Sequence, residues 1–183
     1  VPERGINAVS RAMHLLSALG EKLDCHSFAA SYEKYIADDY TGGLLGCACS
    51  DKESGVLTFN PGKITLENND VKILAGIRYP VSKKYETFAT CIKAVAEKMH
   101  CECKIIDHMS PIYFKRDDEV VVLLEKAYRD VTGDDVNQPF TVGAATFART
   151  MPNTVAFGPI FPEQEEMSHL PNEFISIEDL NKT

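Results

Sequence analysis

Two apolar strand patterns joined by a short polar turn constrain the fold of this chain more than any other feature. Residues 55–66 and 71–79 are rich in β-branched and large apolar side chains, which favour strands. Residues 67–70, which separate them, have the sequence Glu-Asn-Asn-Asp, and asparagine tolerates the positive φ angles of tight turns. The pattern therefore predicts an antiparallel hairpin.

Helical patterns flank this hairpin on both sides. Apolar residues recur at helical spacing in 5–19, 28–36 and 83–99, and residues 101–107 alternate as a strand would. The order is helix, strand, strand, helix, strand. With one strand before residue 1 it becomes βαββαβ, so we expect an α+β, ferredoxin-like sandwich whose first strand is missing, with two helices on one face of an antiparallel sheet.

The last third of the chain has a different character. Residues 117–131 are predicted to form a helix that begins with three acidic residues. Residues 137–149 and 153–158 suggest a buried strand, a turn of small residues and a second apolar strand, with the first strand centred on 140–142. Small residues let a ligand approach the backbone, and His169 follows on a loop, where histidine often binds metal. We expect a domain boundary between residues 110 and 115.

Composition excludes some classes of protein. The net charge of −8 and the pI of about 5.1 argue against a nucleic-acid partner, which requires a basic face. No apolar run approaches the roughly 18 residues of a membrane span. The chain begins Val-Pro-Glu-Arg, without a secretory leader or an initiator methionine. We therefore expect a cytoplasmic protein and a fragment of a longer chain.

The six cysteines leave two interpretations open. They include two Cys-x-Cys pairs, which on a strand would place both thiols on one face. One interpretation is a structural zinc site with His100 and His108 nearby, although Cys-x-x-Cys is the usual spacing. The other is a set of small core residues in a reducing cytosol, and this second interpretation is favoured.

Several ordered stretches of the chain resemble a known family. They are residues 2–8 (Pro-Glu-Arg-Gly-Ile-Asn-Ala), 54–62 (Ser-Gly-Val-Leu-Thr-Phe-Asn-Pro-Gly), 76–80 (Gly-Ile-Arg-Tyr-Pro), 142–149 (Val-Gly-Ala-Ala-Thr-Phe-Ala-Arg) and 153–173. Each stretch is weak alone, but the ordered set resembles the dipeptidase V branch, related to Xaa-His dipeptidases and carnosinases, of the aminoacylase/carboxypeptidase-G di-zinc peptidases. The resemblance implies a ferredoxin-like lid over 1–110, followed over 111–183 by the C-terminal portion of an α/β zinc-peptidase catalytic domain.

The same resemblance assigns a metal ligand. His169 matches the family's C-terminal metal ligand, and we expect Asn172 and Glu173 to hold its loop or orient its ring. The family uses two zinc ions per active site, with manganese or cobalt as possible substitutes. The plainer alternative is a solvent-exposed histidine on a polar loop.

The resemblance also assigns substrate contacts. Arg78 matches a lid arginine that approaches the substrate carboxylate, a task suited to its planar fork, and Asn60 matches a lid asparagine that reaches the site. Gly143, Ala144, Ala145 and Thr146 occupy a substrate-binding turn that is richer in glycine in the family, so the two alanines restrict its backbone. The alternatives are a solvated strand residue for Arg78 and a simple Asn-Pro-Gly turn for Asn60.

The function that follows is hydrolysis of dipeptides with a free N-terminus by a two-metal-activated water. This chain would supply lid contacts and one metal ligand, with no catalytic residue of its own. It would need the rest of the catalytic domain and be inactive alone. The leading alternative is a non-enzymatic ferredoxin-like module that binds a small molecule or dimerises through an exposed sheet edge. A zinc-storage or redox protein built on the cysteines is the third possibility.

Overall fold

The computed structural model describes residues 5–68, 70–162, 164–165 and 167–183. The chain divides into two compact units, unit 1 (Val1–Pro111) and unit 2 (Ile112–Thr183). Residues 2–4 of the first family-like stretch and Asn69 of the predicted turn lie outside the described residues. Whether the units are a lid and part of a catalytic domain stays a prediction. None of the described helices has the length and apolar character needed to cross a membrane.

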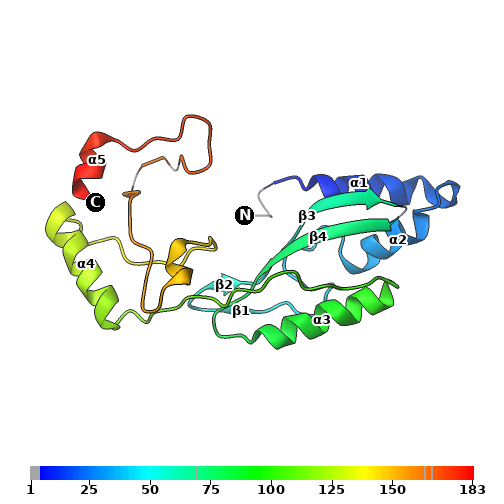
Figure 1. Cartoon of the computed structure of the whole chain (residues 1–183), viewed down its shortest axis with the longest axis horizontal. Coiled ribbons are helices and arrows are strands. Elements are labelled where there is room, and N and C mark those ends of the chain that lie inside the picture. The colour runs from blue at the N-terminus through cyan, green and yellow to red at the C-terminus, as the bar shows by residue number, and fades with distance from the viewer. Residues whose placement is uncertain (1–4, 69, 163, 166) are drawn as a thin grey trace. The chain divides into compact units, whose positions relative to one another are not determined.

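Unit 1 combines helices with two small antiparallel sheets (Figure 1). Its elements are α1 (Ala8–Ala18), the 3-10 helix η2 (Gly20–Lys22), α2 (His26–Tyr35), β1 (Ser50–Asp51), β2 (Gly55–Val56), β3 (Thr58–Glu67), β4 (Asp70–Arg78) and α3 (Tyr85–Lys98). The expected α+β character is confirmed, and so are the helices predicted over 5–19, 28–36 and 83–99, to within a few residues at their ends.

The predicted hairpin is present as β3 and β4. Their register runs from Thr58 opposite Arg78 to Glu67 opposite Asp70, with a bulge where Gly62 is left out of the pairing. Asn68 in the turn has φ 52°, a left-handed conformation that asparagine tolerates. Figure 1 shows β3 and β4 as two long arrows that lie side by side.

The inner face of the hairpin packs against the core of unit 1. Phe59 is 4% exposed and its cross-strand partner Ile77 is half-buried. Alternate residues on β4 are more exposed, as expected when one face of a strand is covered. The core is completed from all three helices and the residues before β3, with Val9, Met13, Ala29, Tyr32, Ile36, Leu45, Cys47, Leu57, Phe88 and Val95 buried.

Helix α1 is joined to the end of α2 by buried polar contacts as well as apolar ones. Ser10 is fully buried, and its Oγ lies 2.9 Å from the Tyr32 hydroxyl and donates to the Ala37 carbonyl at 3.1 Å. These bonds satisfy a hydroxyl that would otherwise be costly to bury. They also fix the angle at which α1 meets α2.

Two strand predictions in unit 1 were wrong in detail. Residues 101–107 form no strand, so the described sheet contains two strands in place of the four of a ferredoxin-like sandwich. Alternating side chains only prepare a segment for pairing, and a strand forms when a neighbour's backbone completes its hydrogen bonds. The sequence pattern predicted one strand over 55–66, whereas the structure divides these residues between β2 and β3, and β2 pairs with β1, with Ser50 opposite Val56.

Unit 2 is built around α4 (Glu119–Thr132), with the short helices η3 (Phe147–Thr150) and α5 (Ile177–Lys182). The helix predicted over 117–131 is confirmed as α4, and Gly133 ends it in a left-handed conformation, φ 69°. The strands predicted at 140–142 and 153–158 are wrong, because these described residues have no paired backbone neighbour. The expected burial of the first one is also wrong, since Phe140 is 84% exposed.

Candidate substrate-binding and metal-binding residues

Asn60 and Arg78 lie on one face of the β3–β4 hairpin. Asn60 is opposite Gly76 and Thr58 is opposite Arg78, and residues two apart on a strand share a face. Asn60 and Arg78 are therefore diagonal neighbours, a relationship that typically puts Cα atoms about 7–8 Å apart. The sequence named both residues as substrate contacts, and the hairpin places them on the face opposite Phe59.

The side chain of Arg78 extends from the end of β4 and is exposed. Within the described part of the chain, no carboxylate forms an ion pair with it. A guanidinium that is not engaged inside the protein keeps its paired N–H groups for an anion. This geometry suits the predicted role, although it equally describes a solvated arginine.

The backbone after Arg78 is held by a group of stacked rings. The ring centroid of His108 lies 3.8 Å from that of Tyr85 and 6.0 Å from that of Tyr79, and its Nε2 lies 2.8 Å from the Tyr79 hydroxyl. Tyr79 also contacts Phe88 at 4.8 Å. These contacts join the end of β4, the start of α3 and the segment before unit 2. The sequence had offered His108 only as a neighbour of the cysteines, because stacking between distant rings leaves no local pattern.

Asn60 contacts the first turn of α1. Its Oδ1 accepts a hydrogen bond of 3.0 Å from Nδ2 of Asn7, and the same Nδ2 donates to the Pro61 carbonyl at 3.0 Å. Asn7 is also the N-cap of α1, where its Oδ1 accepts from the Ser10 N–H at 3.0 Å. The start of α1 is thus tied to the strand that carries Asn60.

The cysteines of unit 1 are free thiols, and with the other described residues they are not grouped as metal ligands would be. Among the described residues, no group of three or more His, Cys, Asp or Glu side chains is arranged to hold a metal ion. Burial, with the Cys91 and Cys49 thiols close by, raises the pKa of Cys47 to about 11, which opposes the thiolate that metals require. Cys47 is 6% exposed and packs as a small core residue, as the plainer interpretation expected.

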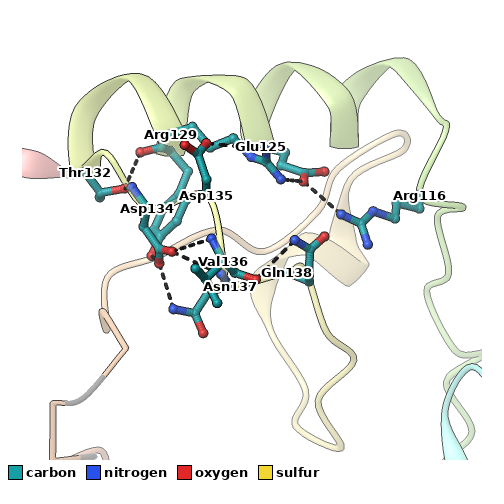
Figure 2. Close-up of polar contacts among 10 residues, drawn as sticks. Arg116, Glu125, Arg129, Thr132, Asp134, Asp135, Val136, Asn137 and Gln138 are labelled. Atoms are coloured by element: carbon teal, nitrogen blue, oxygen red, sulfur yellow. Dashed lines mark hydrogen bonds and ion pairs between the residues drawn. The ribbon is translucent and has the colours of Figure 1, made fainter.

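In unit 2, charged residues brace the C-terminal half of α4. Figure 2 shows Glu125 between two arginines. Its Oε1 accepts from Nη2 of Arg116 at 2.9 Å and from Nη2 of Arg129 at 2.5 Å, while Arg129 also lies 3.6 Å from Asp135. The Glu125 side chain is only 16% exposed, so its charge needs these partners.

Asp134 organises the backbone immediately before the predicted substrate-binding turn. Its carboxylate accepts hydrogen bonds from the Tyr128 hydroxyl at 2.6 Å, from the Val136 N–H at 2.9 Å and from the Asn137 N–H at 3.0 Å. The Asn137 bond is among those drawn in Figure 2. The Tyr128 hydroxyl and then the donors of Asn137 and Val136 hold the pKa of Asp134 well below its usual range. The start of the 137–149 segment is therefore fixed relative to α4.

The turn Gly143–Ala144–Ala145–Thr146 is exposed and leads into η3. Its glycine and both alanines avoid the left-handed region of φ, so this conformation does not require glycine at the two alanine positions. Ala148 is buried, 7% exposed, and holds the end of the turn in unit 2. The structure thus places no strain on the two residues that depart from the family's glycines.

His169 lies at a turn with its side chain exposed. Its φ is 64° and that of Asn172 is 62°, so two left-handed residues give the loop its shape. Glu173 Oε2 accepts from the His169 backbone N–H at 3.3 Å, and the Glu173 N–H donates to the Leu170 carbonyl at 3.2 Å. Glu173 therefore contacts the backbone of His169, and no bond from it to the imidazole is present.

As a single donor, the exposed imidazole of His169 is suited to metal binding. The described residues do not make up a complete metal site, because no three donor side chains come together among them. A catalytic zinc usually has about three protein ligands.

The chain thus combines an α+β unit, whose hairpin carries Asn60 and Arg78 on one face, with a second unit that exposes His169 on a loop. The chain belongs to peptidase family M20/M25/M40, whose family model matches residues 8–183. It is 31% identical over 180 residues to a protein named "Putative dipeptidase" from Staphylococcus saprophyticus subsp. saprophyticus. Proteins of the same name from Staphylococcus aureus strains MW2 and USA300 are 29% and 28% identical over 180 residues. Each alignment covers 98% of this chain and 38% of the relative, so the chain spans well under half the length of these relatives.

Proposed function

We propose that this chain is the lid and C-terminal segment of a cytoplasmic, metal-dependent dipeptidase of the dipeptidase V type, which hydrolyses dipeptides with a free N-terminus. Family membership and the names of the relatives support a peptidase. The observation that carries the lid assignment is the shared face of Asn60 and Arg78. On that face an amide and a guanidinium that has no ion-pair partner among the described residues are available to one extended ligand.

In this proposal, Arg78 binds the substrate's C-terminal carboxylate through a bidentate contact. Asn60 hydrogen-bonds an oxygen of the same dipeptide, and the turn Gly143–Ala144–Ala145–Thr146 contacts the substrate's main chain. Each contact orients the peptide bond, and correct orientation alone can lower a reaction barrier substantially. The chain's own residues therefore bind and orient, and none of them takes a proton from water.

His169 is proposed as one ligand of a zinc pair, with manganese or cobalt as alternatives, while Asn172 and Glu173 hold its turn. When bound, such metals would supply an activated water and polarise the peptide carbonyl. The remaining ligands and the general base would come from residues outside this chain. We accordingly expect no dipeptide hydrolysis by the purified 183-residue chain, even with added zinc. Turnover by that chain that a chelator abolishes would contradict this part of the proposal.

The substrate role of Arg78 is tested by replacing it in the intact enzyme, a chain as long as the relatives that this sequence matches. Arg78→Met should raise KM for a dipeptide by at least about tenfold, because it removes a charge-assisted bond. The same variant should leave unchanged the weaker cleavage of the matching dipeptide amide, which has no C-terminal carboxylate. Equal losses on both substrates would assign Arg78 a structural role and remove the main support for the lid contact.

A second candidate is self-association through the hairpin, which would suit a non-enzymatic binding module. The observation in its favour is that, in the described part of unit 1, no third strand pairs with β3 or β4. Unpaired strand edges can add strands from another copy. Sedimentation at several protein concentrations tests it. A dimer that tightens with a small ligand supports the module, whereas a monomer, or a weak dimer that ignores ligand, supports the excised lid.

A further inference from the structure

The geometry points to Asn7 as a positioning residue: it fixes the amide of Asn60 as a hydrogen-bond donor, so that Asn60 and Arg78 together form a two-donor site for a carboxylate-bearing ligand. This inference rests on the proposed function, because it concerns the same hairpin face. It adds a residue 53 positions from Asn60 whose role would otherwise be only to cap a helix.

The orientation of the Asn7 amide follows from two backbone groups of fixed polarity. The Ser10 N–H can only donate, so the Asn7 atom 3.0 Å from it must be the acceptor Oδ1. The Pro61 carbonyl can only accept, so the atom 3.0 Å from it must be Nδ2. The chemistry of these two backbone groups therefore sets the orientation of the Asn7 side chain.

The orientation of Asn60 follows in turn. One Nδ2 proton of Asn7 is used by Pro61, and the other is directed at Asn60, which must therefore present Oδ1. This leaves Nδ2 of Asn60, with its two protons, free of any hydrogen bond to a described residue. A reversed Asn60 would bring two donors together, so the arrangement resists flipping.

The strand surface between the side chains of Asn60 and Arg78 carries no side chain at Gly76, and we call this surface the floor of the site. Gly76 lies opposite Asn60, and a Cβ added there would meet no heavy atom within 4 Å. Its φ is outside the left-handed region, so the backbone does not demand glycine. A glycine with neither a steric nor a conformational reason allows a ligand to approach the strand closely.

The charges on this face of the hairpin favour an anion at the end that carries Asn60 and Arg78. Arg78 brings a guanidinium without a described ion-pair partner. The acidic residues Glu67 and Asp70 lie opposite each other at the turn end of the hairpin, away from Arg78, and Lys72 forms an ion pair with Glu67 at 2.7 Å. A ligand with a carboxylate and a neighbouring carbonyl oxygen can therefore accept bonds from both Arg78 and Asn60.

Asn7→Asp separates the positioning role from the capping role. Aspartate still accepts from the Ser10 N–H and favours the start of a helix, but it has no proton to donate. Asn60 should then turn its Nδ2 toward residue 7 and present an acceptor to the ligand. Asn68→Asp, at the turn of the same hairpin, makes the same change in charge without touching Asn60, and serves as the matched control.

The measurement is an NMR titration of the isotope-labelled chain with N-acetylglycinate, and with N-acetylglycinamide as the probe without a carboxylate. In the wild type, the acid should shift the side-chain signals of Asn60 and Arg78, and the amide should leave Arg78 unshifted. In Asn7→Asp, the Asn60 shift should disappear, the Arg78 shift should remain, and the apparent Kd should rise by up to about tenfold, as for the loss of one hydrogen bond. Asn68→Asp should behave as wild type.

The outcomes distinguish the two levels of the proposal. If the acid shifts neither residue in the wild type, the lid contact of the proposed function fails, and this inference fails with it. If the wild type responds and Asn7→Asp gives the same shifts and Kd, only the role of Asn7 is overturned. A further measurement uses only the wild type, so it remains informative even if Asn7→Asp does not fold. Solvent exchange of the side-chain amide protons should be slow for Asn7 and fast for Asn60, and the reverse order would overturn the inference.

Gly76→Val tests the floor independently. Valine suits a strand, so the hairpin should keep its backbone signals, while the added side chain should cover the space between the donors. The titration should then show no shift at Asn60. Unchanged binding by this variant would show that the ligand does not approach the strand at Gly76, and would overturn the two-donor site.

Discussion

Nε2 of His14, on α1, lies 2.9 Å from the Asp38 carboxylate, which follows α2. On its other side, Nδ1 of His14 lies 2.7 Å from Oε1 of Glu33. That second contact is close, but Glu33 Oε1 is buried without a well-directed hydrogen bond, so we attribute to it mainly attraction between charges. Glu33 and Asp38 thus join α1 to α2 by an ionic link one turn further along α1 than the Ser10–Tyr32 contact.

This link should make stability depend on pH. The hydrogen bond that His14 donates to Asp38, and then the contact with Glu33, raise the pKa of His14 above 6.5 against the effect of burial, and His14 lowers the pKa of Asp38 below 3.8. Because its pKa is raised, His14 contributes its full stabilisation below pH 6.5, and this contribution is lost as the pH rises through its folded pKa. Because its pKa is lowered, Asp38 contributes stabilisation above pH 3.8, and this contribution is lost as the pH falls through its folded pKa. The link should therefore be strongest between these two values.

We predict that His14→Gln costs more free energy of unfolding at pH 5.5 than at pH 8.5. The difference should stay under about 1 kcal/mol, because the side chains are partly exposed and water screens them. Urea unfolding at both pH values measures it. His100→Asn, an exposed left-handed histidine replaced by a residue that tolerates φ 55°, should leave the pH dependence unchanged. A larger cost at pH 8.5 would be inconsistent with a charged His14.

Gly42 should be far less tolerant of substitution than a neighbouring glycine with the same backbone conformation. Its φ is 78°, and an added Cβ would lie 2.9 Å from Leu57 Cδ2 and 3.1 Å from Cys47 Sγ. Gly46 has φ 73° with nothing within 4 Å. Gly46→Ala should cost only the left-handed backbone, about 1–2 kcal/mol. Gly42→Ala should cost a further 1–3 kcal/mol or so, because it overpacks the core.

Thermal unfolding of the two variants measures this difference. The pair separates strain in the backbone from crowding in the core, since both substitutions add one methyl group at a left-handed glycine. Equal losses for Gly42→Ala and Gly46→Ala would mean that Leu57 and Cys47 move aside without cost, and that the core near Gly42 is looser than the structure indicates.

The helices and the hairpin could be predicted from the sequence because their signals are local. Helical spacing of Val9 and Met13 was enough to locate α1, and the asparagines of residues 67–70 located the turn. The predicted strands at 101–107 and 140–142 failed for a common reason. Their side-chain pattern was suitable, but a strand also needs a neighbour, and in the described chain none pairs with them.

The candidate site could be predicted only in part. Resemblance to a family suggested Asn60 and Arg78, and the two-residue period of strands is enough to place both on one face once the register is known. The bond between Asn7 and Asn60 could not be foreseen, because it joins residues 53 positions apart. The one local sign was that Asn7 precedes a helical pattern, which indicated a cap and nothing more.

Asp51 should link the β1–β2 hairpin to the segment that precedes α3. Its Oδ1 accepts from the Ser54 N–H at 2.6 Å, and its Oδ2 accepts from the Ser82 N–H at 3.0 Å. Burial would raise the pKa of Asp51, but the bonds from Ser82 and Ser54 outweigh it and hold the pKa well below the usual range. Since a lowered carboxylate pKa stabilises at neutral pH, this contribution should be lost only in strong acid.

We therefore predict that Asp51→Asn lowers the unfolding temperature at pH 7 and speeds hydrogen exchange at the Ser54 and Ser82 amides. Both effects should shrink as the pH is lowered below 3.8 toward the pKa of the wild-type carboxylate. Glu102→Gln, an exposed acidic residue outside these contacts, should change neither quantity. Unchanged exchange at Ser82 in Asp51→Asn would show that this bond does not restrain the segment.

His169 should contribute to metal binding and very little to folding. Its side chain is exposed and its loop is held by Glu173 through the backbone, so the imidazole itself can be removed without loosening the turn. Asparagine is the suitable replacement because it tolerates the left-handed φ of 64°. His169→Asn should leave the free energy of unfolding within about 0.5 kcal/mol of wild type.

The same substitution in the intact enzyme should lower bound zinc, measured after purification without added metal, and should abolish dipeptide hydrolysis. Glu173→Gln is the informative comparison, because its amide oxygen can still accept from the His169 N–H. It should retain the turn and most of the metal. If His169→Asn keeps a full complement of zinc, His169 is a loop residue only, and the proposed metal ligand must be sought elsewhere in the family's C-terminal segment.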